Sequence, residues 1–141
     1  MLNRKLNKIK KNVKKIAAKS VKVGVPASAA PYQDGMSTAV VAAVHEYGSL
    51  VRNVPPRPFI RPGGEKTIAI LPKVIRQYSK ELASGKMQAD QFWGIVGTLG
   101  VGNIRGIWDD NNWAPLKHNP ENRQPLLDTG HLKGSITYQV I

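Results

Sequence analysis

The stretch QADQFWGIVGTLGVGNIRGIWD, residues 88–109, decides the expected architecture because its apolar residues recur at helical spacing and predict one long helix. Four of its residues are expected to be buried: Phe92, Val96, Leu99 and Ile107. Small residues also recur four apart along one face: Gly94, Thr98, Gly102 and Gly106. Because minimal side chains let another backbone approach closely, this strip predicts a close crossing with a second helix.

A second helical pattern precedes this stretch and opens at the glycine pair 63–64. Its apolar residues repeat at helical spacing until Ser84 and Gly85 stop the pattern: Ile68, Leu71, Ile75, Tyr78 and Leu82. Pro72 lies inside the pattern and lacks the N–H that a helix interior needs. The helix is therefore expected to kink or split near Ile70.

Upstream of the glycine pair, residues 51–62 (VRNVPPRPFIRP) predict a fixed, extended arm, because prolines remove N–H donors and keep the residues before them extended. One interpretation is a merely rigid loop. The other is an arm that packs across the domain or onto a neighbouring subunit, with its arginines making bidentate carboxylate contacts. The candidates for a subunit interface are Arg57, Pro58, Phe59, Ile60, Arg61 and, in the long polar loop 109–125, Trp113.

Shorter elements complete the chain. Alternating residues predict strands at 21–25 and 136–140, and GHLKGS at 130–135 predicts one turn of helix. Between them, Ser37 is a candidate N-cap for a short helix from Thr38 that ends at Gly48. The valine content of that segment leaves a strand as the alternative.

The first twenty residues hold eight of the 21 basic side chains and none of the nine acids. Apolar residues recur there at steps of four and three, which places them on one helical face: Leu2, Leu6, Ile9, Val13 and Ile16. The cations occupy the rest of the helix and are the candidates for contact with a negative surface: Arg4, Lys5, Lys8, Lys10, Lys11, Lys14, Lys15 and Lys19. We expect residues 1–20 to form a basic amphipathic helix and residues 21–141 a single domain.

Three roles remain open for this helix: packing on its own domain or an adjacent subunit, docking on nucleic acid, or lying on an anionic membrane. The absence of Trp and Phe from the segment counts against the membrane, so no membrane partner is expected. Non-specific contact with DNA fits the net charge of +12.

The motifs do not indicate an enzyme. The chain has no cysteine, and GVGNIRG at 100–106 lies in a helical pattern without the preceding strand of a dinucleotide site. His45, His118 and His131 lack the short spacing of metal ligands and are interpreted as surface or packing residues. No catalytic residue, metal or cofactor is expected.

Three motifs occur in a fixed order: AVVAAVHEYGS at 39–49, VPPRPFIRP at 54–62, and NNWAPL with PLLDTGHLKGSITYQV at 111–140. In this order they resemble the tail-completion and minor tail (neck) proteins of tailed bacteriophages and prophages. The resemblance covers residues 21–141. The chain departs from it by ending after the strand at 136–140, where many relatives have a further strand.

The resemblance implies an α+β subunit in which two longer helices pack on a small antiparallel sheet, here with a basic N-terminal helix and an extended proline arm added. It also implies a structural virion protein, assembled in the host cytoplasm, that forms a homo-oligomeric ring between the tail tube and the head connector. The implied partners are further copies of the chain and neighbouring phage tail-tube, terminator or connector proteins. The alternative function is a small basic nucleic-acid-binding protein that uses the N-terminal helix.

Overall fold

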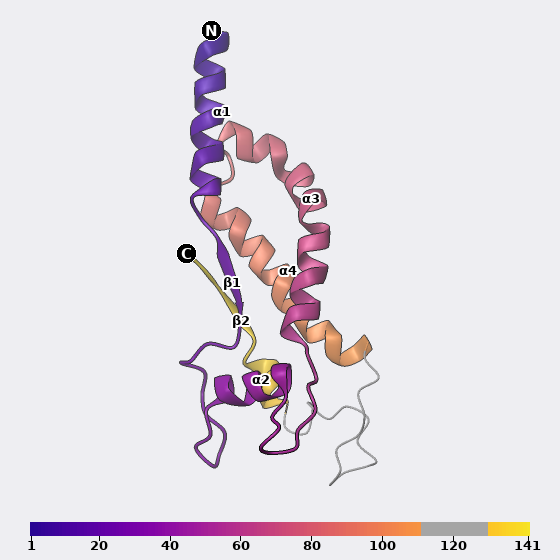
Figure 1. Cartoon of the computed structure of the whole chain (residues 1–141). Helices are drawn as coiled ribbons and strands as arrows, with labels where there is room; N and C mark the ends of the chain where they lie inside the picture. The colour runs from indigo at the N-terminus through magenta and orange to yellow at the C-terminus, as the bar shows by residue number, and fades with distance from the viewer. Residues whose placement is uncertain (111–129) are drawn as a thin grey trace.

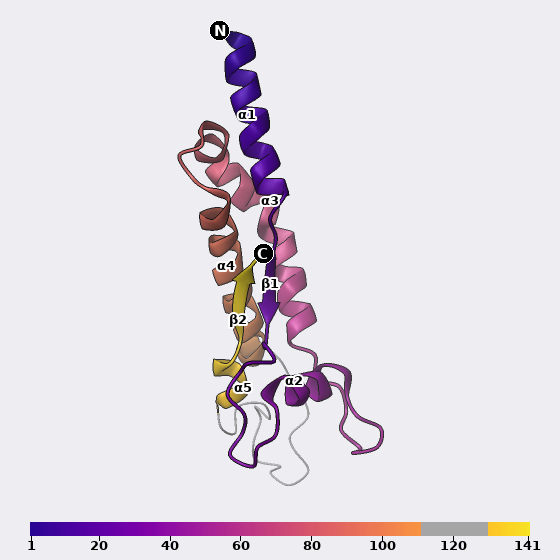
Figure 2. The same ribbon diagram turned by 90° about the vertical axis from the view of Figure 1, so that its left-hand side faces the viewer.

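Two long helices, α3 and α4, lie side by side, and a two-stranded sheet lies against α4 (Figure 1 and Figure 2). The computed structural model describes residues 1–110 and 130–141. Its elements, in chain order, are α1 (Leu2–Ala17), β1 (Val21–Gly24), α2 (Thr38–Tyr47), α3 (Ile60–Ser84), α4 (Ala89–Asp110), α5 (His131–Gly134) and β2 (Thr137–Val140). This arrangement confirms the expected α+β fold with a small antiparallel sheet.

The sheet pairs the strand that follows α1 with the strand near the C-terminus. Strand β1 pairs with β2 in antiparallel register from Val21↔Val140 to Gly24↔Thr137. Ser20 and Ile141 continue the ladder with two backbone hydrogen bonds of 3.1 and 2.9 Å. Both strands were expected from alternation in the sequence, and both are confirmed. In the described ranges neither strand has a second neighbour in the sheet, so their outer edges are unpaired.

Helix α2 is a helix rather than the alternative strand. It begins at Thr38 and ends before Gly48, whose φ of 76° is a backbone conformation that favours glycine. Ser37 occupies the N-cap position but forms no side-chain capping hydrogen bond. The hydroxyl of Thr38, which is fully buried, instead donates to the carbonyl of Ala30 at 2.6 Å.

Helix α3 begins three residues earlier than the glycine pair suggested, so the extended arm ends at Phe59 rather than Pro62. Pro62 is accommodated because the first turn of a helix does not need that N–H. The helix also continues through Pro72 to Ser84, and Figure 1 shows its axis bending about midway. The proline therefore produces the expected kink and no split. Gly85 ends the helix in the left-handed conformation, with φ 79°.

The prediction that a second helix crosses α4 closely at the strip of small residues four apart was wrong. A Cβ added at Gly102 or Gly106 would meet open space, whereas one added at Gly97 would overlap the ring of Tyr138. A Cβ at Gly100 would lie 3.0 Å from a methyl group of Val23. The glycines that permit close approach therefore lie under the sheet. Helix spacing alone could not show which face of α4 the strands would cover.

The close crossing of α3 and α4 depends instead on a glycine of α3. A Cβ added at Gly63 would lie only 2.5 Å from the Cα of Ile104. The neighbouring Gly64 has open space at the same position. One residue of α3 thus sets how near the two helices lie.

Buried side chains form two clusters. The first consists of Ala42, Phe59, Ile104, Ile107, Trp108, Leu132 and Ile136. The second consists of Val74, Leu82, Phe92 and Val96, with Ile16 and Val21 among the residues packed against it. Phe92, Val96 and Ile107 are buried as expected, but Leu99 is 36% exposed and the expectation of its burial was wrong.

Candidate interaction surfaces

The proline arm is fastened to the chain's own core. Phe59 has no exposed surface, and its ring meets Trp108 edge to face with centroids 4.7 Å apart. Arg57 is 6% exposed, and its backbone N–H donates to the carbonyl of His45 at 2.6 Å. Phe59 and Arg57 were interface candidates, and their burial corrects this: the arm packs across its own domain, and the Phe59 ring offers no surface to a neighbour.

The other interface candidates are placed differently. Pro58 is exposed and Ile60 is half-buried. Arg61 is exposed, and its Nε lies 3.5 Å from a carboxylate oxygen of Glu65 one helical turn later. Trp113 lies outside the described residues, as do His118 and the motif residues between 111 and 129.

A buried carboxylate in α2, which was not among the predicted site residues, holds the junction between the arm and α3. The Glu46 carboxylate accepts the backbone N–H groups of Phe59 and Ile60 at 2.8 and 2.9 Å through Oε2, and that of Arg61 at 2.9 Å through Oε1. Residues at a helix N-terminus lack intrahelical acceptors for their N–H groups, and the helix dipole favours an anion there. Glu46 is therefore the cap of α3, supplied from another helix.

A signal for this role existed in the sequence. Glu46 lies in the last turn of its own helix, where the dipole disfavours an acid, and it is the only acid in the apolar run 38–47. An acid at such a position indicates donors elsewhere in the fold. Its neighbour His45 is half-buried, and burial, followed by the positive charge of Arg57, lowers the pKa of the imidazole from its ordinary value.

Residues 49–54 form a tight loop that we call the apolar tip, so the extended arm begins after Val54 rather than at Val51, where the sequence predicted it. Ser49 and Val54 pair as an isolated antiparallel bridge, and Gly48 packs so closely on the arm that an added Cβ would lie 2.9 Å from the nitrogen of Pro56. At the end of this loop Leu50 and Val51 are fully exposed. Two large apolar side chains on a braced loop contribute nothing to the monomer's core, and such surface is typical of contact sites.

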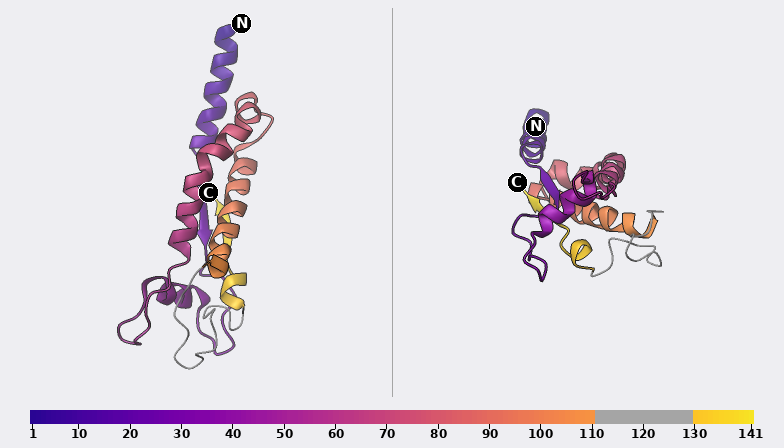
Figure 3. Two further views of the ribbon diagram at one scale, coloured as in Figure 1. Left: turned by 90° about the vertical axis from the view of Figure 1, so that its right-hand side faces the viewer. Right: turned by 60° about the horizontal axis from the view of Figure 1, so that its bottom comes forward.

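Helix α1 extends beyond the rest of the chain, as all views show (Figure 1 and Figure 3). Only its C-terminal end is attached: Asn12 donates to the carbonyl of Ala83 at 2.9 Å, and the indole of Trp93 donates to the carbonyl of Ile16 at 3.0 Å. Of the eight cations, Lys19 pairs with Asp90 at 2.8 Å. The other seven form no ion pair with the described part of the chain.

His131 is a packing residue, as expected. Its Nε2 lies 3.0 Å from the hydroxyl of Thr38 and 2.8 Å from the carbonyl of Ala30, and its ring meets Tyr32 edge to face. Among residues 1–110 and 130–141 there is no group of three side chains that could hold a metal ion. Nor does any described helix have the length and apolar character needed to cross a membrane.

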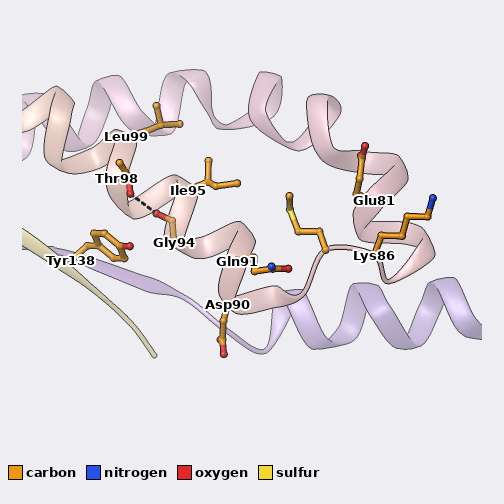
Figure 4. A pocket seen from close by; sticks show the side chains of 10 residues that line it. Glu81, Lys86, Asp90, Gln91, Gly94, Ile95, Thr98, Leu99 and Tyr138 are labelled. Atoms are coloured by element: carbon orange, nitrogen blue, oxygen red, sulfur yellow. Dashed lines mark hydrogen bonds between the residues drawn. The ribbon is translucent and has the colours of Figure 1, made fainter.

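A groove of about 710 Å³ lies between α4, β2 and the turn that joins α3 to α4 (Figure 4). Apolar side chains of Ile95, Leu99 and Tyr138 line one part of it, and Thr98 donates to the carbonyl of Gly94 within its wall. The charged side chains are Glu81, Lys86 and Asp90: Glu81 and Lys86 lie at the other end of the groove, and Asp90 projects from the start of α4 between the two ends (Figure 4). Asp90 is already paired with Lys19. The apolar part of the groove suits contact with an apolar side chain.

Comparison with known proteins adds little. No protein-family model matches the chain, and no solved structure matches it. A stretch of 43 residues is 44% identical to an uncharacterized protein of Methanocaldococcus jannaschii. This stretch is 30% of the chain and covers 32% of the archaeal protein, so the match spans about a third of that relative's length. It carries no statement about the function of the whole chain.

Proposed function

We propose that the chain is a structural virion protein, a ring-forming tail-completion or neck adaptor that joins the tail tube of a bacteriophage to the head connector. In this proposal the partners are further copies of the chain and the neighbouring tail-tube, terminator or connector proteins. The protein assembles in the host cytoplasm and resides in the tail or neck of the virion. The ordered motifs from residue 39 to residue 140 are the starting point of the proposal.

The observation that carries the proposal is that two of these motifs form one braced unit. Glu46 of the first motif binds the backbone of Phe59, Ile60 and Arg61 in the second. The unit displays the apolar tip, with Leu50 and Val51 fully exposed. Holding a loop in its contact conformation lowers the entropy cost of association, which favours a role as a contact element.

A closed ring also requires two different complementary surfaces on each copy, because its contacts are head to tail. The apolar tip is a protrusion, and the groove beside Ile95, Leu99 and Tyr138 is a hollow on a separate part of the chain. These surfaces supply the two kinds of patch that the proposal needs.

Native mass spectrometry and negative-stain microscopy of the purified protein, alone and with its tail partners, test the proposal. We expect closed rings, and we expect the double substitution Leu50→Asp with Val51→Asp to abolish them without changing the monomer's melting temperature. Ala27→Asp, on an exposed loop away from the tip, is the matched control and should leave rings intact. Protein that stays monomeric with all partners, and virions that assemble normally without it, would refute the proposal.

A second candidate function rests on α1. The seven cations of α1 form no ion pair with the described residues, since only Lys19, just beyond the helix, pairs with Asp90, and such a helix suits non-specific binding to a phosphate backbone. A DNA-binding titration against salt tests it: removing Lys10, Lys11, Lys14 and Lys15 should reduce the slope of log K on log salt by about 3 to 4. The absence of binding even at low salt would eliminate this candidate.

A further inference from the structure

The apolar stripe of α1 is exposed in the chain described here. None of the helix's residues is buried: Leu2 is 72% exposed, Leu6 44%, Ile9 40% and Val13 53%. Only the last member of the stripe, Ile16, packs against the second core cluster. The stripe thus begins at the second core cluster and extends past the rest of the molecule. No described residue packs over its exposed part.

The spacing of the stripe is that of a coiled-coil seam. Steps of four and three place Leu2, Ile9 and Ile16 at one core position of a heptad, and Leu6 and Val13 at the other. The seam covers about two heptads, and the 16-residue helix is about 24 Å long. A second helix would cover such a seam with its own apolar residues.

The flanks of the seam indicate which helix would fit. Within the helix the positions that border it are Asn3, Lys5, Lys10, Asn12 and Ala17, and the first twenty residues contain no acid. If two copies of α1 paired, these lysines would face the cations of the other copy in either orientation, and flanking charges of one sign oppose pairing. A second copy is therefore a poor partner, and an acidic one is complementary.

The base of α1 is already positioned to receive a partner. Asn12 caps the end of α3 at Ala83, Trp93 binds the carbonyl of Ile16, and Lys19 pairs with Asp90. An isolated helix with this charge is marginal in water, so attachment at one end reduces the entropy that docking must overcome.

From these observations we infer that the α1 stripe docks an acidic amphipathic helix of a different protein, with apolar residues along its seam and carboxylates beside it. The inference does not depend on the proposed virion role. The cations on the far side of α1, including Arg4, Lys11 and Lys15, stay accessible when this partner is bound.

The test uses the full-length protein and a synthetic 21-residue helix with Leu and Ile at the seam and Glu at both flanks, measured by fluorescence anisotropy. A peptide of the same composition in scrambled order, and one with Lys at the flanks, are the controls. We expect the Glu-flanked peptide to bind at least tenfold more tightly than either. Ile9→Asn should weaken its binding on the order of tenfold, since 1.4 kcal/mol of lost apolar contact is a factor of ten. Asn7→Ala, on the opposite face, should leave binding unchanged.

A charge exchange makes the test specific. Lys5→Glu with Lys10→Glu should reverse the preference, so that the Lys-flanked peptide binds and the Glu-flanked one does not. Circular dichroism melting should show an unchanged body in every variant, because all the substituted positions are exposed. If the scrambled peptide bound as tightly as the Glu-flanked one, or if Ile9→Asn did not weaken binding, α1 would attract acidic peptides through its charge alone. Either result would overturn the inference. If the protein self-associated and Ile9→Asn abolished this self-association, the α1 stripe would bind a second copy of the chain. That result would also overturn the inference.

Discussion

The cap that Glu46 provides can be tested by Glu46→Gln. The amide keeps one oxygen for the N–H groups of Phe59 and Ile60, but its NH₂ then faces the N–H of Arg61, so that hydrogen bond is replaced by a contact between two donors. Hydrogen bonds to a charged group contribute about 1.5–3 kcal/mol and neutral ones about 0.5–1.5 kcal/mol. The favourable interaction of the charge with the α3 dipole is lost too.

We therefore expect Glu46→Gln to lower the free energy of unfolding by about 3 kcal/mol, a large part of a typical total of about 5–15 kcal/mol. For a domain of this size the melting temperature should fall by about 6–12 °C. Urea unfolding followed by circular dichroism measures the first quantity, and a thermal scan measures the second.

Glu65→Gln is the matched control, because it makes the same chemical change beside the same helix end. The Glu65 side chain is 69% exposed and its ion pair with Arg61 is a surface pair, so the loss should stay below about 1 kcal/mol. If the two variants lost equal stability, the hydrogen bonds to Glu46 would not stabilise the junction of the arm and α3, and Glu46 would not be an effective cap.

Three further predictions concern the core. Gly63→Ala should destabilise the fold by about 1–3 kcal/mol, since its Cβ would meet the α4 backbone. Gly64→Ala, which has open space at the same position, should stabilise the fold by about 0.5–1 kcal/mol. Equal free energies of unfolding for the two variants in urea would contradict this prediction. Phe59→Ala should cost the monomer about 3–5 kcal/mol because the ring is fully buried, and a lost ring assembly with an unchanged melting temperature would show that the aromatic serves a neighbour instead. The lowered pKa of His45 means that the unfolded chain binds the proton more tightly, so this residue's contribution to stability should fall as pH drops below about 6.5; urea midpoints at pH 7.5 and 5.5 should differ less in His45→Gln.

Local patterns in the sequence determined where most elements lie. The strand at 21–25, the helix from Thr38 to Gly48 and the long helix at 88–109 were predicted to within about two residues. Periodicity and the residues that end helices are local properties, and the chain carries them wherever it packs. The kink at Pro72 follows for the same reason, since a missing N–H acts within one turn.

Only the tertiary structure decided which faces meet. The small residues of α4 that matter are Gly97 and Gly100, under the sheet, and not the strip four apart that the sequence displays. Phe59 is in the chain's own core, and α3 starts at Ile60 because a carboxylate thirteen residues before Phe59 caps it. Such contacts join segments that are distant in sequence. A local pattern can mark Glu46 as an acid in need of donors, but it does not identify which donors they are. The sequence of α1 showed that it is a basic amphipathic helix. It did not show that most of the apolar stripe lies past the rest of the molecule, because that depends on where α3 and α4 turn.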